Sequence, residues 1–245
     1  MDAKTSLDTA CSQPAWTAGL RLLVFDLDGT LIDSAGDIID SANAALRELG
    51  RAALPGEVIA GYIGNGAPVL MERVLARSNG QPADDAAASA ALRGSAVYQR
   101  ALASFLSIYD RNKLARTRLY EGVEPGLQRL ERKYTLAVLT NKPERMSREI
   151  LTGLGIADLL ARIYGGDSFA TKKPDPEGLL RLLEELGIRP EEALMVGDSA
   201  VDIRAGKNAG CHTCAVSYGL GTATLAEETA ELHLDRFAEL LHWLE

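Results

Sequence analysis

The sequence predicts an α/β protein with a doubly wound parallel sheet and an all-helical segment inserted after the first strand. Three observations support this fold class. Short apolar runs, such as residues 22–25 and 193–196, end in polar residues, as buried parallel strands do. From Glu121 onward such runs alternate with helical patterns, which is typical of strand-helix-strand units with right-handed crossovers. Residues 34–118 carry helical patterns only.

The first half of the chain contains one predicted strand and several predicted helices. Residues 22–25 form the strand, and a helix follows that ends at Gly50. A Pro55-Gly56 turn leads to further helical patterns. These cover residues 69–77 and 91–109, whereas the alanine-rich residues 83–92 fit a helix or a loop.

The second half alternates between helix and strand. The predicted strands cover residues 135–139, 163–166, 193–196 and 213–217, the last of the sheet. The predicted helices cover residues 124–133 and 143–154 and two further segments that end at Gly187 and Gly210. We therefore expect a Rossmann-like catalytic core formed by residues 20–33 and 119–245, and a helical cap formed by residues 34–118.

Composition and charge narrow the range of partners. The 245 residues are 47% hydrophobic and 24% charged, which is typical of a globular protein, and the net charge of −8 disfavours nucleic acid and anionic membranes as partners. No apolar run reaches the roughly 18 residues of a membrane span, and residues 1–19 lack the apolar core of a secretory signal. Three cysteines do not predict a disulfide framework. We expect a cytoplasmic protein with a mobile N-terminal extension over residues 1–19.

The most informative residues directly follow the first predicted strand. Asp26 and Asp28 lie at its carboxyl end, where open α/β sheets bind ligands. Two carboxylates so close repel each other unless a cation lies between them or one is protonated. Aspartate and glycine are also common in turns that have no function. Asp26, Asp28 and Gly29 therefore do not by themselves distinguish a functional site from an ordinary turn.

Other strand ends carry matching polar residues. Thr140 and Asn141 follow the strand over 135–139, Asp198 and Asp202 follow the strand over 193–196, and Lys173 lies in a loop between them. Each has an ordinary explanation, since Thr, Asn and Asp cap helices and most lysines are solvated. Helix capping does not explain why all of these residues occur together and in this order. Because parallel strands end at one edge of a sheet, we expect these side chains to converge.

These motifs resemble those of the haloacid dehalogenase-like phosphatase superfamily over nearly the whole chain. Four segments carry the resemblance: Asp26-Leu27-Asp28-Gly29-Thr30, Thr140, Lys173-Pro174 and Gly197-Asp198-Ser199-Ala200-Val201-Asp202. Further segments resemble its phosphoglycolate phosphatase branch: Asp33-Ser34, Gly64-Asn65-Gly66, Thr140-Asn141-Lys142-Pro143 and Lys173-Pro174-Asp175-Pro176.

The resemblance implies a fold, a mechanism and roles for individual residues. Asp26 is expected to form an aspartyl-phosphate, and Mg²⁺ to be bound by Asp26, Asp198 and the backbone carbonyl of Asp28. Lys173 is expected to supply positive charge beside the transferring phosphoryl group. Thr140 and Asn141 are expected to bind its oxygens, and Asp202 to orient Lys173 or hold a metal-bound water.

Asp28 favours ester hydrolysis over dehalogenation, because an alkoxide leaving group needs a proton and a halide does not. The expected substrate is a small phosphorylated metabolite, with 2-phosphoglycolate preferred. Another small ester such as a sugar phosphate, a phosphomutase reaction, and a non-catalytic phosphoacceptor or binding module are the alternatives. The sequence leaves monomer and homodimer open.

One further motif competes with this interpretation. Cys211-His212-Thr213-Cys214 has the spacing of a redox or zinc site, but it enters an apolar strand in which positions three apart face opposite ways. A second pair of ligands is lacking nearby. We expect structural cysteines.

Overall fold

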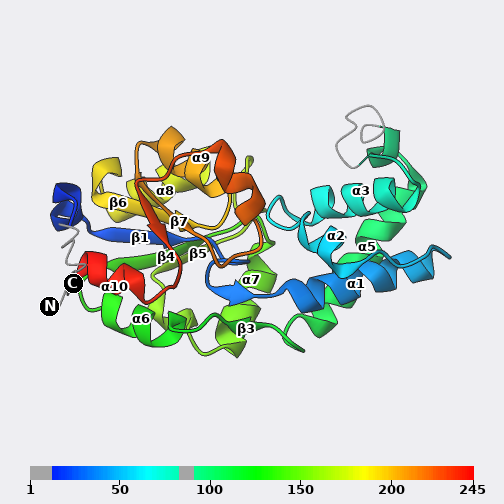
Figure 1. Ribbon diagram of the computed structural model, residues 1–245, viewed down its shortest axis with the longest axis horizontal. Helices are drawn as coiled ribbons and strands as arrows, with labels where there is room; N and C mark the ends of the chain where they lie inside the picture. The colour runs from blue at the N-terminus through cyan, green and yellow to red at the C-terminus, as the bar shows by residue number, and fades with distance from the viewer. Residues whose placement is uncertain (1–12, 83–90) are drawn as a thin grey trace, which may run out of the picture.

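The computed structural model describes residues 13–82 and 91–245. Figure 1 shows two bodies side by side, a sheet enclosed by helices and a smaller group of helices. Among the described residues, no helix has the length and apolarity needed to cross a membrane. The predicted α/β class, with a parallel sheet and inserted helices, is confirmed.

The larger body is organised around a six-stranded parallel sheet in the order β5-β4-β1-β6-β7-β8. Strand β1 lies in its interior, and Val24 pairs with Ala137 on one side and Met195 on the other. All four residues of β1 are buried, as its unbroken apolar run predicts. The strands are β1 Leu22–Phe25, β4 Thr135–Leu139, β5 Arg162–Tyr164, β6 Ala193–Gly197, β7 His212–Val216 and β8 Leu232–Leu234.

Helices cover both faces of this sheet, as a doubly wound fold requires. Leu23 and Phe25 face an apolar cluster that also contains residues of α6, α7 and α10, whereas Leu22 and Val24 face a second cluster with residues of α8 and α9. Alternate residues of β1 thus serve opposite faces. The helices are α6 Val123–Leu130, α7 Glu144–Gly153, α8 Glu177–Leu186, α9 Ala200–Ala209 and α10 Glu239–Leu244. Short 3-10 helices cover Ala157–Leu159 (η2), Pro190–Glu192 (η3) and Thr222–Glu227 (η4).

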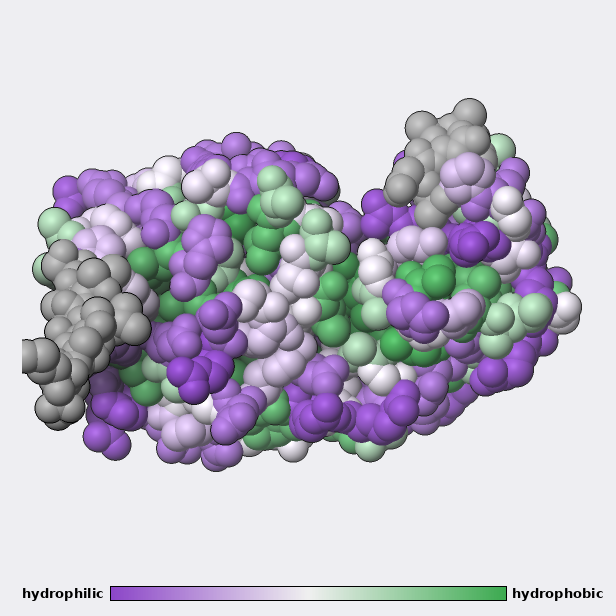
Figure 2. Space-filling model, in the orientation of Figure 1, coloured by the Kyte–Doolittle hydropathy of each residue, from purple (hydrophilic) through white to green (hydrophobic). Residues whose placement is uncertain are grey.

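The smaller body lies in sequence between β1 and α6 and has an apolar core of its own. Its helices include α1 Ala35–Glu48, α2 Gly56–Ala60, α3 Ala67–Ser78 and α5 Ala96–Asn112. Helices α1, α3 and α5 pack together around residues such as Leu46, Met71 and Phe105. Figure 2 shows apolar residues at the surface where the two bodies meet and hydrophilic residues along their outer edges. The predicted boundaries of the cap, residues 34 and 118, stay a prediction.

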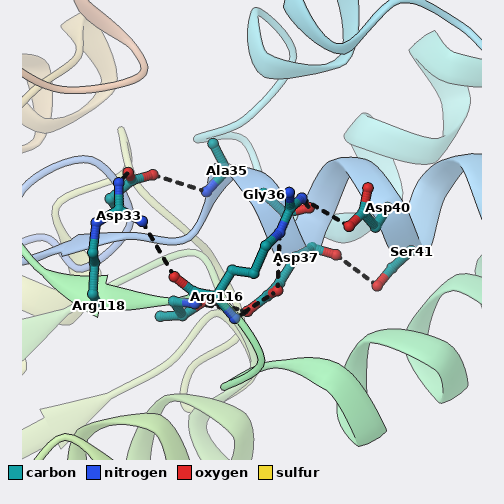
Figure 3. Close-up of polar contacts among 9 residues, drawn as sticks. Asp33, Ala35, Gly36, Asp37, Asp40, Ser41, Arg116 and Arg118 are labelled. Atoms are coloured by element: carbon teal, nitrogen blue, oxygen red, sulfur yellow. Dashed lines mark hydrogen bonds and ion pairs between the residues drawn. The ribbon is translucent and has the colours of Figure 1, made fainter.

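Two chain segments connect the bodies, and they lie side by side. Strands β2 Ile32–Asp33 and β3 Arg118–Leu119 form an antiparallel pair, and Arg118 also forms an ion pair with Asp33. Directly beyond them, the buried carboxylate of Asp37 accepts hydrogen bonds from the backbone N–H groups of Arg116 and Thr117 (Figure 3). The outgoing and returning segments are therefore held together by charge-assisted hydrogen bonds.

The structure adds elements to those predicted. The sheet does not end with the strand predicted over 213–217, because β8 pairs with β7 beyond it and α10 follows. Residues 13–19 of the predicted mobile extension include the 3-10 helix η1 Ala15–Gly19, in which the Trp16 ring stacks on His212 at 4.1 Å. Residues 1–12 and most of the segment 83–92 lie outside the described residues.

Candidate active site

The predicted convergence at the carboxyl edge of the sheet is visible in the structure. Asp26 directly follows β1, Thr140 follows β4 and Asp198 follows β6, the three adjacent strands at the centre of the sheet. All three side chains are buried. Residues more than a hundred positions apart in sequence therefore share one site, because parallel strands of one sheet end at the same edge.

Lys173 is the cation that contacts Asp26. Its Nζ lies 2.7 Å from Asp26 Oδ1 and 2.6 Å from Asp202 Oδ1, and all three side chains are buried. Burial lowers the pKa of Lys173, but the charges of Asp202 and Asp26 more than offset this effect and raise the pKa to about 12. The ammonium therefore stays charged between the two carboxylates. Asp202 thus contacts Lys173 directly, and its role in orienting Lys173 stays a prediction.

Three acids form a cluster around this cation. Carboxylate oxygens of Asp26, Asp198 and Asp202 all lie within 4.8 Å of one another. Burial is the main reason that the pKa of Asp26 rises to about 6, although Lys173 opposes it; burial and the charges of Asp202 and Asp26 raise the pKa of Asp198. With Lys173 counted, the ionised cluster carries two uncompensated negative charges. Hard oxygen donors with this charge fit one divalent cation.

The Asp198 side chain is in close contact with the backbone of two neighbouring segments. Its Oδ2 accepts hydrogen bonds from the backbone N–H groups of Leu220 and Gly221, each at 2.7 Å. Gly29 has a φ of +90°, and a Cβ at this position would lie 2.0 Å from Asp198 Oδ2. The glycine of the DxDGT segment is therefore required twice, for its backbone conformation and for the space that Asp198 occupies.

Asp28 lies apart from this cluster and has partners of its own. Its Oδ1 accepts hydrogen bonds from Ser34 Oγ at 2.5 Å and from Lys142 Nζ at 2.8 Å. Lys142 Nζ in turn lies 2.7 Å from the hydroxyl oxygen of Tyr109, which belongs to α5. The side chains of Asp26 and Asp28 thus face different cations, one in each group. Gly29 permits the turn that separates them.

Ser34, Lys142 and Tyr109 are site residues that sequence reasoning missed as participants. Ser34 and Lys142 belong to segments that carry the finer resemblance, so their motifs were visible while their partner, Asp28, was not. Tyr109 had no sequence signal beyond its place in a helical pattern. Its approach to Lys142 depends on how the smaller body sits on the sheet.

Thr140 and Asn141 occupy the floor of the site, with different surroundings. Thr140 Oγ1 accepts a hydrogen bond from the backbone N–H of Lys142 at 3.3 Å. Asn141 Nδ2 donates to the carbonyl oxygens of Gly64 and Lys173, both at 3.1 Å. Asn141 therefore connects the loop at Gly64 to the Lys173 loop. Its contact with phosphate oxygens stays a prediction. The buried Asn141 Oδ1 has no hydrogen-bond partner among the described residues.

A cavity opens beside these groups, between the two bodies. Asp26, Asp28 and residues 140–143 line it from the sheet side. The cap contributes mostly apolar residues: Ile38, Ile63, Gly64, Gly66, Ala67, Leu70, Phe105, Leu106 and Tyr109. The cavity thus joins a polar floor to an apolar roof, as in sites for small ligands.

The fold and this site together define a hydrolase-type enzyme with a carboxylate at the end of its central strand, a buried lysine, and acids that fit a divalent cation. The chain belongs to the haloacid dehalogenase-like hydrolase family, whose model matches residues 23–216. The resemblance seen in the motifs is thereby confirmed.

Individual relatives agree with this assignment. The chain is 40% identical over 204 residues to a phosphoglycolate phosphatase of Psychrobacter arcticus, covering 81% of this chain and 84% of the relative. It is 39% identical over 225 residues to a phosphoglycolate phosphatase of Rhodospirillum rubrum, with 91% and 90% covered. The crystal structure of a predicted phosphoglycolate phosphatase from Haemophilus somnus superposes with a TM-score of 0.83 at 31% identity, covering 93% of this chain and 99% of that chain.

Proposed function

We propose that this protein is a Mg²⁺-dependent phosphatase that hydrolyses 2-phosphoglycolate to glycolate and phosphate. The observation that carries the proposal is the pairing of Asp26 with Lys173 beside Asp198, with Asp28 two residues away and facing a separate cation. The names of the relatives supply the choice of substrate.

Asp26 is the proposed nucleophile. Its carboxylate oxygen forms a bond to phosphorus while the bond from phosphorus to the ester oxygen breaks, which gives an aspartyl-phosphate. A carboxylate that approaches a phosphate faces a repulsion of about 4 kcal/mol per charge pair at 4 Å and an effective dielectric constant of about 20. Lys173, which contacts Asp26, offsets part of this repulsion. Asp26, Asp198 and the backbone carbonyl of Asp28 would hold Mg²⁺, which would supply the remaining positive charge.

Asp28 is the proposed general acid and base. It gives a proton to the departing glycolate oxygen in the first step. In the second step it takes a proton from the water that attacks phosphorus, and the bond to Asp26 breaks. A positioned acid of this kind is worth about 10²- to 10⁴-fold in rate. Thr140, at the floor of the cavity, is a proposed ligand of the phosphate oxygens.

The helical segment over residues 34–118 is proposed to act as a cap over this chemistry. Its apolar residues roof the cavity that contains Asp26 and Asp28. Such a roof excludes bulk water and limits the size of the substrate. A small metabolite is therefore favoured over a macromolecular phosphate ester.

The partner and the compartment follow from charge and cysteine chemistry. The net charge of −8 supports a small metabolite, attracted by local cations, and argues against nucleic acid or a membrane surface. Cys211 and Cys214 are free and buried, which supports the reducing cytoplasm as the compartment.

A panel of phosphate esters tests this function. The purified protein with Mg²⁺ is expected to release phosphate from 2-phosphoglycolate with a higher kcat/KM than from glucose 6-phosphate, glycerol phosphates or phosphoserine. A higher value for a sugar phosphate would overturn the substrate. Isomerised sugar phosphate with little free phosphate would indicate a mutase, and a single phosphorylation without turnover would indicate a phosphoacceptor.

A further inference from the structure

Lys142 supplies positive charge to the cavity. Of the described residues that line it, Lys142 is the only cation, whereas Asp26 and Asp28 are the only acids. Lys173 lies behind them, enclosed by Asp26 and Asp202. The proposed chemistry so far gives Lys142 no task, although burying its charge is costly unless the charge is compensated.

The contacts of Lys142 leave room for one more partner. An ammonium group has three N–H donors. Asp28 Oδ1 at 2.8 Å accepts one and Tyr109 Oη at 2.7 Å accepts a second. The Lys142 ammonium also lies 4.6 Å from the centre of the Tyr109 ring, which adds a cation–π attraction. One N–H therefore remains for a bound ligand that accepts hydrogen bonds.

The position of Lys142 relative to Asp28 matches the covalent structure of the substrate. In the proposed reaction Asp28 faces the ester oxygen. In 2-phosphoglycolate the carboxylate is joined to that oxygen through a single CH₂ group. A cation in direct contact with Asp28 is therefore at the right separation to bind this carboxylate while the proton is transferred.

The cap also contributes partial positive charge to this cavity. Gly66 and Ala67, at the N-terminus of the twelve-residue helix α3, line the same cavity. Helix N-termini carry a partial positive charge. A carboxylate bound in this cavity is thus attracted both by the full positive charge of Lys142 and by a partial positive charge from the cap.

We propose that Lys142 is the carboxylate subsite of this enzyme and that Tyr109 is the residue that positions it. The subsite selects phosphate esters with a carboxylate on the ester carbon over esters that carry a neutral group at this position. This proposal rests on the proposed function and adds the residue that sets the substrate class.

A pair of matched substrates tests the subsite. Ethyl phosphate is the analogue of 2-phosphoglycolate in which a smaller, neutral methyl group replaces the carboxylate. The measured quantity is the preference ratio, which is kcat/KM for 2-phosphoglycolate divided by kcat/KM for ethyl phosphate. Damage to Asp28 affects both substrates and cancels in this ratio, whereas loss of the carboxylate contact does not.

Two variants and one control are compared with the wild-type enzyme. Lys142→Met keeps the length of the side chain and removes the charge, and it is expected to lower the preference ratio by roughly 10- to 100-fold, the effect of one charge-assisted hydrogen bond. Tyr109→Phe keeps the ring and is expected to lower the ratio several-fold, mainly through KM. Tyr134→Phe removes a buried hydroxyl that donates to the Leu244 carbonyl, and it is expected to keep the wild-type ratio.

The outcomes separate the two proposals. A wild-type enzyme that does not hydrolyse 2-phosphoglycolate overturns the proposed function and the subsite together. A wild-type enzyme that does, with an unchanged ratio in Lys142→Met, overturns the subsite alone and leaves Lys142 as a partner of Asp28. If Lys142→Met does not fold, as judged by circular dichroism, an unchanged ratio in Tyr109→Phe overturns the proposal.

Discussion

Individual residues of the site fall into two charge groups, and this division decides what each carboxylate can do. Asp26 shares Lys173 with Asp202, whereas Asp28 shares Lys142 with Tyr109 and also accepts a hydrogen bond from Ser34. Removing one partner of a buried ion pair leaves an uncompensated charge. The two aspartates, only two positions apart, therefore respond differently to substitution.

Replacement of Asp26 by asparagine is expected to abolish turnover. The amide keeps the size of the side chain, but it is a poor nucleophile and lacks the charge that Lys173 balances. Phosphate release from 2-phosphoglycolate is the measurement, with circular dichroism as the check on folding. A folded Asp26→Asn protein with wild-type activity would remove this residue as the nucleophile.

Replacement of Asp28 by asparagine is expected to separate the two chemical steps. The amide that replaces the carboxylate cannot act as a general base toward the attacking water, so hydrolysis of the phosphoenzyme slows by about 10²- to 10⁴-fold. An ester with a good leaving group, such as p-nitrophenyl phosphate, still phosphorylates Asp26. Intact-protein mass spectrometry is expected to show the phosphorylated variant accumulating. Unphosphorylated protein during slow turnover would contradict the assignment of Asp28 as the base of the second step.

Among the elements, the paired strands β2 and β3 connect the two bodies. Hydrogen bonds to Asp37 hold the two connecting segments together. Asp37 Oδ2 accepts hydrogen bonds from the Thr117 backbone N–H at 2.9 Å and from the Thr117 hydroxyl at 2.8 Å. Because Asp37 lies in α1 and Thr117 just before β3, these bonds join chain segments 80 residues apart.

Replacement of Asp37 by alanine is expected to lower the free energy of unfolding by about 3 kcal/mol, because buried donors lose a charged acceptor. Urea unfolding measures this change. Asp40→Ala is the control: its carboxylate, with 69% of the side chain exposed, pairs with Arg116 at the surface, where such pairs contribute about 0 to 1 kcal/mol. Equal losses in the two variants would refute the role given to Asp37.

Strand β7 explains the CxxC motif. Cys211 precedes the strand and Cys214 lies within it, and both thiols are buried and free. Burial raises the pKa of Cys211 to about 12 and also raises that of Cys214. Since the thiolate is the reactive form, both side chains are expected to resist iodoacetamide at pH 8 in the native protein and to react after unfolding. Peptide mapping measures this, and rapid native labelling of Cys214 would contradict the buried position.

Strongly patterned elements could be predicted from the sequence, and short ones could not. The strand predicted over 135–139 has the same bounds as β4. Its pattern is clear, because a run of apolar residues follows Thr135 and ends at the polar Thr140. Strand β8 has three residues with His233 exposed between Leu232 and Leu234, which is too short a pattern to separate from a loop. Strands β2 and β3 have two residues each and depend on a partner 85 positions away.

For the molecule as a whole, the predicted convergence of distant acids could be foreseen because parallel topology imposes it. The residues that form the roof of the cavity could not be predicted from the sequence. Tyr109 meets Lys142 only through the placement of the cap on the core, and sequence periodicity carries no information on such a contact between bodies. The same holds for Asn141 and Gly64.

Binding of the metal is expected to stabilise the whole molecule. A ligand that binds only the folded state at 100 times its Kd adds about 2.7 kcal/mol to the free energy of unfolding. Protein treated with a chelator is expected to lose activity, and added Mg²⁺ to restore it and raise the Tm. In the Asp198→Asn variant, Mg²⁺ is expected no longer to raise the Tm, because the acidic cluster has lost a negative charge and a metal ligand. An undiminished rise in this variant would place the ion elsewhere.

The position of β1 inside the sheet has a consequence for biosynthesis. The strand that carries the proposed nucleophile is translated before its neighbours β4 and β6, which follow more than a hundred residues later, after the cap helices. Nascent chains that stop before β6 therefore lack Asp198, Asp202 and one flank of β1. The proposed active site therefore cannot be complete in the growing polypeptide until β6 and the residues that directly follow it have been translated.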